Sequence, residues 1–204
     1  MFFNPAYPTY QAFVALGIAA IVTALLMPLW IKLLKIEGIG QQVRADGPKR
    51  HLVKQGTPTM GGVVILLGIV VSCLLLAQPA PSIMLAAGAA LATGALGLLD
   101  DVTSVAQGRS LGLTPRAKMV GLTLIVVAFF LAAVNLCGVE PVIRFPGGFA
   151  IDLGVLTTTF SVAGTTISVP WLYLVFVFLL LAGMSNAVNL TDGLDGLAGG
   201  TVMI

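Results

Sequence analysis

Long apolar runs alternate with short polar segments along the 204-residue chain. A helix needs about 20 apolar residues to cross the hydrocarbon core of a bilayer. Runs that approach this length cover residues 10–33, 60–76, 82–99, 119–137 and 171–188, and another begins near residue 197. The pattern predicts an all-α polytopic membrane protein with about five complete transmembrane helices and the start of a sixth.

The composition agrees with this pattern. Hydrophobic residues make up 58% of the chain and charged residues only 9%, whereas soluble domains are about half apolar and a quarter charged. Cys73 and Cys137 both lie in apolar runs, which disfavours a disulfide framework or a thiolate metal site. We expect residues 1–204 to form a single integral membrane domain. The last apolar run is too short to cross a bilayer, so we also expect the chain to be a C-terminally truncated fragment.

Residues 138–169 differ in composition from the apolar runs. This segment is rich in Thr, Val and Ile, and Gly164 could support a turn. Such a composition is typical of strands joined by a tight connection. We expect a short β-hairpin outside the bilayer on the external side, with an irregular loop as the alternative.

Basic residues are unevenly distributed between the two sides of the predicted bundle. Only Arg144 falls on the side of the expected hairpin; the other nine are Lys32, Lys35, Arg44, Lys49, Arg50, Lys54, Arg109, Arg116 and Lys118. Loops rich in Lys and Arg stay in the cytoplasm. The distribution therefore predicts that the loops at residues 34–59 and 100–118 are cytoplasmic.

Two adjacent carboxylates, Asp100 and Asp101, follow the uncharged run at 82–99. Neighbours on a helix point about 100° apart, so they cannot easily clamp one ion together. They could divide two tasks, one binding a metal and the other handling a proton. Mg²⁺ suits such a site, because it takes one or two carboxylates together with substrate phosphates. The alternative is that they are interfacial charges paired with nearby arginines.

Two further polar stretches, KQGTPTMGG and NAVNLTDGLDGLAGG, share the predicted cytoplasmic face. The first precedes a predicted helix whose free N–H groups could bind an anion, although such basic loops also anchor lipid head groups. In the second, Asp192 and Asp195 are three residues apart and would share one helix face. Together the stretches favour metal-assisted phosphoryl transfer from a soluble anionic donor to a lipid phosphate.

The stretches DGPKRHLVKQGTPTMGG, LGLLDD and NAVNLTDGLDGLAGG resemble the phospho-N-acetylmuramoyl-pentapeptide transferase branch of the polyprenyl-phosphate N-acetylhexosamine-1-phosphate transferase superfamily. The resemblance implies a ten-helix, multi-pass, homodimeric enzyme of the bacterial inner membrane with its active site facing the cytoplasm. It implies Mg²⁺-dependent transfer of phospho-MurNAc-pentapeptide from UDP-MurNAc-pentapeptide to undecaprenyl phosphate, giving lipid I and UMP. It implies no nucleic-acid partner.

The resemblance also assigns roles to residues. Asp100 and Asp101 would be catalytic, and in one assignment Asp100 deprotonates the lipid phosphate. Asp101 and Asp192 would be metal ligands. The substrate-binding residues would be Lys54 and Asp195 at the uracil, Thr59, Asn189 and Asp192 along the ribose and phosphates, and Lys118 near the phosphates.

The chain departs from the family pattern in two places. Family members often carry DDxxK, but Ser104 stands where that lysine would be; Arg109 could supply the charge instead. Family members also carry a further metal-binding aspartate and a histidine-rich cytoplasmic loop toward the C-terminus. Neither occurs before Ile204, so we expect these 204 residues alone to be inactive. The alternatives are a sibling transferase that uses another UDP-N-acetylhexosamine such as UDP-GlcNAc, and a transporter whose acids line a path.

Overall fold

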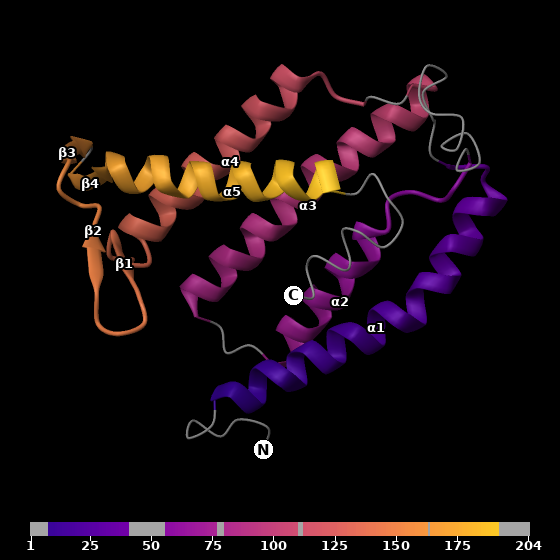
Figure 1. Cartoon of the computed structure of the whole chain (residues 1–204), viewed down its shortest axis with the longest axis horizontal. Helices are drawn as coiled ribbons and strands as arrows, with labels where there is room; N and C mark the ends of the chain where they lie inside the picture. Colours follow the sequence, from indigo (N-terminus) through magenta and orange to yellow (C-terminus); the bar gives the residue numbers. More distant parts are fainter. Residues whose placement is uncertain (1–7, 41–55, 77–79, 110–111, 163, 192–204) are drawn as a thin grey trace. The chain divides into compact units, whose positions relative to one another are not determined.

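The computed structural model describes residues 8–40, 56–76, 80–109, 112–162 and 164–191. Its helices are α1 (Pro8–Ile36), α2 (Gly62–Leu76), α3 (Pro81–Gln107), α4 (Pro115–Asn135) and α5 (Trp171–Thr191), with four short strands between α4 and α5 (Figure 1). The chain divides into two compact units, Met1–Lys118 and Met119–Ile204. The mostly helical architecture predicted from the apolar runs is confirmed.

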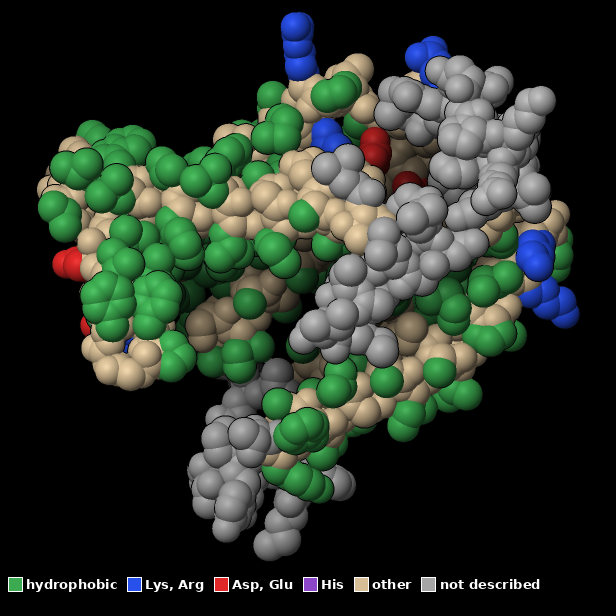
Figure 2. Space-filling view, in the orientation of Figure 1, with side chains coloured by type: hydrophobic (Ala, Val, Ile, Leu, Met, Phe, Trp, Pro, Cys, Tyr) green, Lys and Arg blue, Asp and Glu red, His purple; other side chains and the backbone are tan. Residues whose placement is uncertain are grey.

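Among the described residues, α1, α3, α4 and α5 are long and apolar enough to span a bilayer. Figure 2 shows hydrophobic side chains along the helices and charged ones mostly near their ends. Helix α2 has only 15 residues, or about 22 Å at 1.5 Å per residue, which is less than the hydrocarbon thickness of about 30 Å. The prediction of five complete spans is therefore confirmed for four helices, and the expected start of a sixth lies outside the described residues.

In the first unit, α2 packs against α1 (Figure 1) through a glycine. A Cβ atom at Gly68 would lie 2.7 Å from the carbonyl oxygen of Ala19 and 2.6 Å from the hydroxyl of Thr23. Glycine thus lets the α2 backbone approach the α1 backbone directly, as small residues do between membrane helices. Helix α2 also contacts α3, where the side chain of Leu66 fills the space that a Cβ atom at Gly94 would need.

Helix α3 extends further than the apolar pattern predicts. It begins with Pro81 in its first turn and ends at Gly108, which has the left-handed conformation (φ 59°) typical of a helix C-terminus. The run ends at Leu99, but the helix continues through Gln107. The helix therefore ends about two turns later than the apolar run predicts, and Asp100 and Asp101 lie inside α3 near its C-terminal end.

The second unit contains the predicted β-hairpin. Strands β3 (Thr157–Val162) and β4 (Thr165–Pro170) pair antiparallel, with Phe160 opposite Ile167. Gly164 in the connection has φ +81°, which glycine adopts at little cost. A second antiparallel pair, β1 (Val142–Arg144) with β2 (Ala150–Asp152), was not predicted, because strands of three residues carry little pattern.

The side-chain amide of Asn135 ties this hairpin to α4. The side chain of Asn135, the last residue of α4, accepts a hydrogen bond from the Ser168 N–H at 2.7 Å and donates one to the Ser168 carbonyl at 3.1 Å. The Phe130 and Tyr173 rings, from α4 and α5, lie 6.0 Å apart between centroids. Strand β4, which pairs with β3, is thus fixed to the end of α4.

Gly68→Ala should destabilise the first unit. The new methyl group would overlap the Ala19 carbonyl, and overpacking of this kind costs about 1–3 kcal/mol. Gly88→Ala in α3 is the matched control, since a Cβ atom there meets nothing within 4 Å and alanine favours the helix by about 0.5–1 kcal/mol. Thermal unfolding in detergent should rank Gly88→Ala above the wild type and Gly68→Ala below it; the reverse order would contradict the α1–α2 contact.

Candidate functional site

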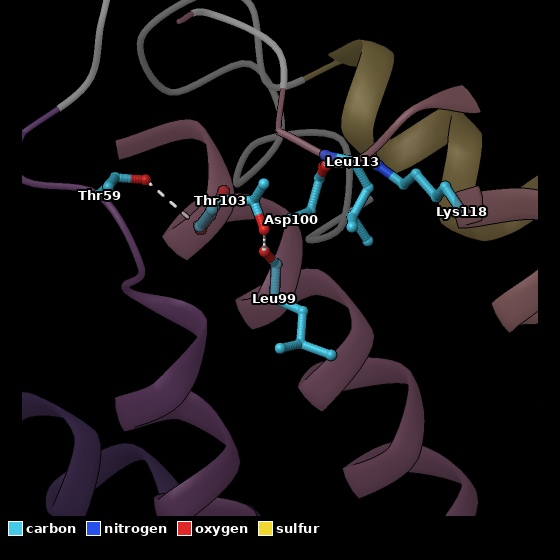
Figure 3. A network of polar contacts seen from close by, with 7 residues as sticks. Thr59, Leu99, Asp100, Thr103, Leu113 and Lys118 are labelled. Carbon is cyan, nitrogen blue, oxygen red and sulfur yellow. Dashed lines mark hydrogen bonds and ion pairs between the residues drawn. The ribbon is translucent and has the colours of Figure 1, made fainter. Parts of the chain in front are cut away.

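Asp100 is held on one side of α3 by two partners (Figure 3). Its Oδ1 accepts a hydrogen bond from the backbone N–H of Leu113 at 2.7 Å. Its Oδ2 accepts one from the Lys118 ammonium at 3.1 Å. In this ion pair the Asp100 side chain is 23% exposed and the Lys118 side chain 22% exposed. Because the pair is only partly exposed, it is screened less by solvent than a surface ion pair.

The segment that provides these partners joins α3 to α4 and fits tightly against α3. A Cβ atom at Gly112 would overlap the backbone carbonyl of Asp100 and lie 2.8 Å from its Oδ1. Thr114 then starts α4, since its hydroxyl accepts a hydrogen bond from the Ala117 N–H at 3.2 Å and Pro115 follows it in the first turn. This start places Lys118 one turn into α4, within reach of Asp100.

Asp101 is contacted from a different segment, the loop that precedes α2. Its Oδ2 lies 3.4 Å from the hydroxyl of Thr59, which donates to it. Met60 has φ +63°, the one positive φ among the described non-glycine residues. This left-handed conformation also explains why α2 begins after residue 60 rather than at it.

The two aspartates therefore face different partners, as expected for neighbours on a helix. Figure 3 shows Thr59 on one side of α3 and Leu113 and Lys118 on the other. In the part of the chain that the structure describes, no group of three or more His, Cys, Asp or Glu residues could hold a metal ion. The arrangement offers a carboxylate with a hydroxyl on one side and a carboxylate with an ammonium on the other.

Four of the predicted site residues thus meet at one level of α3: Thr59, Asp100, Asp101 and Lys118. Asn189 is exposed near the end of α5 in the second unit, whereas Lys54, Asp192 and Asp195 lie outside the described residues. Arg109, which we suggested in place of the family lysine, is exposed, and the cation paired with Asp100 is Lys118. Ser104 instead donates a hydrogen bond to the Arg109 carbonyl at 2.6 Å.

Sequence reasoning missed Gly112 and Leu113. Leu113 contributes only its backbone N–H, for which no side chain gives a signal. The Thr114–Pro115 pair is a recognisable helix start, and it could have placed Lys118 in the first turn of α4 and so near the preceding loop.

Comparison with known proteins identifies the class. The model of Glycosyl transferase family 4 matches residues 83–204, which is more than half of the chain. The chain therefore belongs to this family, and its spanning helices make it a membrane protein. Within that class, residues 54–66 match the phospho-N-acetylmuramoyl-pentapeptide-transferase signature 1, so the predicted resemblance to this branch is confirmed.

Curated relatives named phospho-N-acetylmuramoyl-pentapeptide-transferase match nearly the whole chain. The chain is 39% identical to the one from Corynebacterium jeikeium, over 95% of this chain and 55% of the relative. It is 40% identical to the Bacillus subtilis protein (90% and 53%) and 42% identical to the Desulforudis audaxviator protein (94% and 57%). The chain thus spans slightly more than half the length of these relatives.

Lys118→Met should destabilise the first unit, because it leaves the partly buried Asp100 carboxylate without its cation. Loss of a hydrogen bond to a charged group costs about 1.5–3 kcal/mol. Arg116→Met, a change in the same turn at an exposed side chain, is the matched control and should have little effect on thermal unfolding. Equal unfolding temperatures for the two variants would show that the Lys118–Asp100 pair contributes nothing.

Proposed function

We propose that this chain provides the aspartate pair and the donor-binding loop of a phospho-N-acetylmuramoyl-pentapeptide transferase. The reaction joins a phosphate oxygen of undecaprenyl phosphate to the β-phosphorus of UDP-MurNAc-pentapeptide. The bond between that phosphorus and the bridging oxygen breaks, so that lipid I forms and UMP leaves. The enzyme would act as a homodimer at the cytoplasmic face of the bacterial inner membrane.

The observation that carries this proposal is that Thr59, Asp101, Asp100 and Lys118 converge on one level of α3. Thr59 lies within the segment that matches the transferase signature, and the other three lie within the family match. Two independently recognised parts of the sequence therefore meet through side-chain contacts. A site whose polar groups come from both sides of one helix suits a reaction with two phosphate-bearing substrates.

The two carboxylates have different surroundings, which suggests different tasks. Both oxygens of Asp100 already have partners, the Leu113 N–H and Lys118. An ammonium has three donors, so Lys118 can hold Asp100 and still meet a phosphate oxygen of a substrate. Asp101 faces Thr59, which we place on the side of the nucleotide donor. In this arrangement Asp100 and Lys118 orient the acceptor phosphate, and Asp101 serves the donor.

Mg²⁺ is the cofactor that this site would need. The donor chemistry fits, because Asp101 is a half-buried carboxylate that accepts a hydrogen bond from the Thr59 hydroxyl, whereas Lys118 is paired with Asp100; Asp192 would be the second protein ligand of the ion. When bound, the ion would offset the negative charge that develops on the phosphates during transfer. Lys118 and Thr59 then position the substrates.

Two other functions compete with this proposal. A sibling transferase would use UDP-GlcNAc or another UDP-N-acetylhexosamine, and the signature at residues 54–66 argues against it. A transporter would need carboxylates that line a path along the membrane. Asp100 and Asp101 instead lie at one level of α3, near its C-terminal end, and are paired with loop residues.

Donor choice tests the proposed function. The full-length gene product in membranes should convert UDP-MurNAc-pentapeptide and undecaprenyl phosphate into lipid I, and should release UMP in equal amount. UDP-GlcNAc supplied under the same conditions should give no lipid-linked product. Transfer from UDP-GlcNAc would establish the sibling function, and movement of the intact donor across the membrane without UMP release would establish a transporter.

Asp101→Asn should abolish transfer while leaving the protein folded. The amide keeps the shape of the side chain but removes its charge, and we expect a fall in kcat of about a hundredfold or more, the loss typical of a catalytic electrostatic group. Asp152→Asn in β2 is the control, because Asp152 is exposed and bonds only the Gly154 N–H among the described contacts. Activity of Asp101→Asn equal to that of Asp152→Asn would exclude Asp101 from the reaction.

A further inference from the structure

The segment that carries Thr59, residues 56–60, is held at both of its ends by residues of α1 or just after it. At the first end, Gly40 and Gly56 are in backbone contact, since a Cβ atom at Gly40 would lie 2.5 Å from the Gly56 carbonyl oxygen. At the second end, the indole N–H of Trp30 donates a hydrogen bond to the Met60 carbonyl at 3.2 Å. Thr59 thus lies in a short segment between two anchors on or next to α1.

The second anchor holds an uncommon backbone conformation. A non-glycine residue rarely adopts positive φ without support from its surroundings, and Met60 does so here (φ +63°). Its carbonyl is fixed from two directions, by the Trp30 indole and by the N–H of Val63 in the first turn of α2. The hydroxyl of the preceding residue, Thr59, donates a hydrogen bond to Asp101. Met60 and the adjacent Thr59 therefore connect Trp30 of α1 to Asp101 of α3.

The geometry points to Trp30 as a positioning residue for the transfer reaction: its indole N–H holds Met60 in the left-handed conformation that directs the neighbouring Thr59 hydroxyl at Asp101. This inference rests on the proposed function, because it takes Asp101 to be part of the reacting site. Trp30 acts through Met60 and Thr59 and need not touch a substrate. Met27, one turn earlier in α1, supports the same anchor, since Gly61 faces its side chain.

Trp30→Phe tests the role of the indole N–H. The variant keeps an aromatic ring on α1 but cannot donate to the Met60 carbonyl, so Met60 should leave the left-handed region and turn Thr59 away from Asp101. Misplacement of a catalytic group by about 1 Å can cost up to about a hundredfold in rate. We expect kcat of the full-length gene product to fall about tenfold or more while KM for UDP-MurNAc-pentapeptide changes little. Trp171→Phe, the same change at the other tryptophan of these 204 residues, is the matched control.

A second substitution separates positioning from a general structural role. Glycine reaches positive φ without help, so Met60→Gly should restore most of the kcat lost in Trp30→Phe. Thr59→Val added to Trp30→Phe should cause little further loss, because both changes remove the same contact and their effects should not add. Failure of Met60→Gly to rescue kcat, or additive losses with Thr59→Val, would overturn the inference.

Amide hydrogen exchange gives a readout that does not depend on turnover. Exchange at residues 59–62 should be faster in Trp30→Phe than in Trp171→Phe. If the wild type makes no lipid I, the proposed function fails, and the exchange comparison alone then tests the support of the loop by Trp30. If the wild type is active but Trp30→Phe matches Trp171→Phe in both kcat and exchange, the inference fails and the proposed function stands.

Discussion

A carboxylate in an apolar helix needs polar partners, because an unpaired charge is costly to remove from water. Asp100 and Asp101 obtain these partners from two different segments: the connection before α4 supplies a backbone N–H and Lys118, and the loop before α2 supplies Thr59. This requirement brings both loops to one level of α3. The glycine contacts between α1, α2 and α3 and at Gly112 allow the backbones to come close enough.

The same requirement suggests how the site could carry out transfer. Consecutive helix residues point about 100° apart, and here the two carboxylates contact partners on different sides of α3. One side offers a hydroxyl beside a half-buried acid, and the other offers an ammonium beside an acid whose oxygens are both engaged. In the proposed reaction, a nucleotide-linked phosphate and a lipid-linked phosphate would each approach one side of α3. The two phosphates would meet beside the adjacent aspartates.

Much of this could be read from the sequence, and the failures have physical causes. The apolar runs located all five described helices, and the Thr- and Val-rich segment with Gly164 located the β3–β4 hairpin. The predicted helix ends were wrong where backbone conformation determines them. Helix α3 continues past its charged residues to a glycine in the left-handed conformation. Helix α2 begins later than predicted because Met60 has positive φ. The contacts of Gly112 and Leu113 to Asp100 are made by backbone atoms, which leave no pattern in side-chain types. Lys54, Asp192 and Asp195 stay predictions, because they lie outside the described residues.

The central claim is that the loop before α2 and the aspartates of α3 form one site, and proximity of Thr59 to Asp101 tests it most directly. The measurement is cross-linking of a Thr59→Cys, Asp101→Cys variant of the full-length gene product in membranes. All of its native cysteines, Cys73 and Cys137 among them, are first replaced by alanine, and a short bifunctional thiol reagent is added. The account predicts an efficient intramolecular cross-link between the two introduced cysteines. If each cysteine reacts readily with a monofunctional reagent but the pair gives no cross-link, the two segments are not neighbours and the account is contradicted.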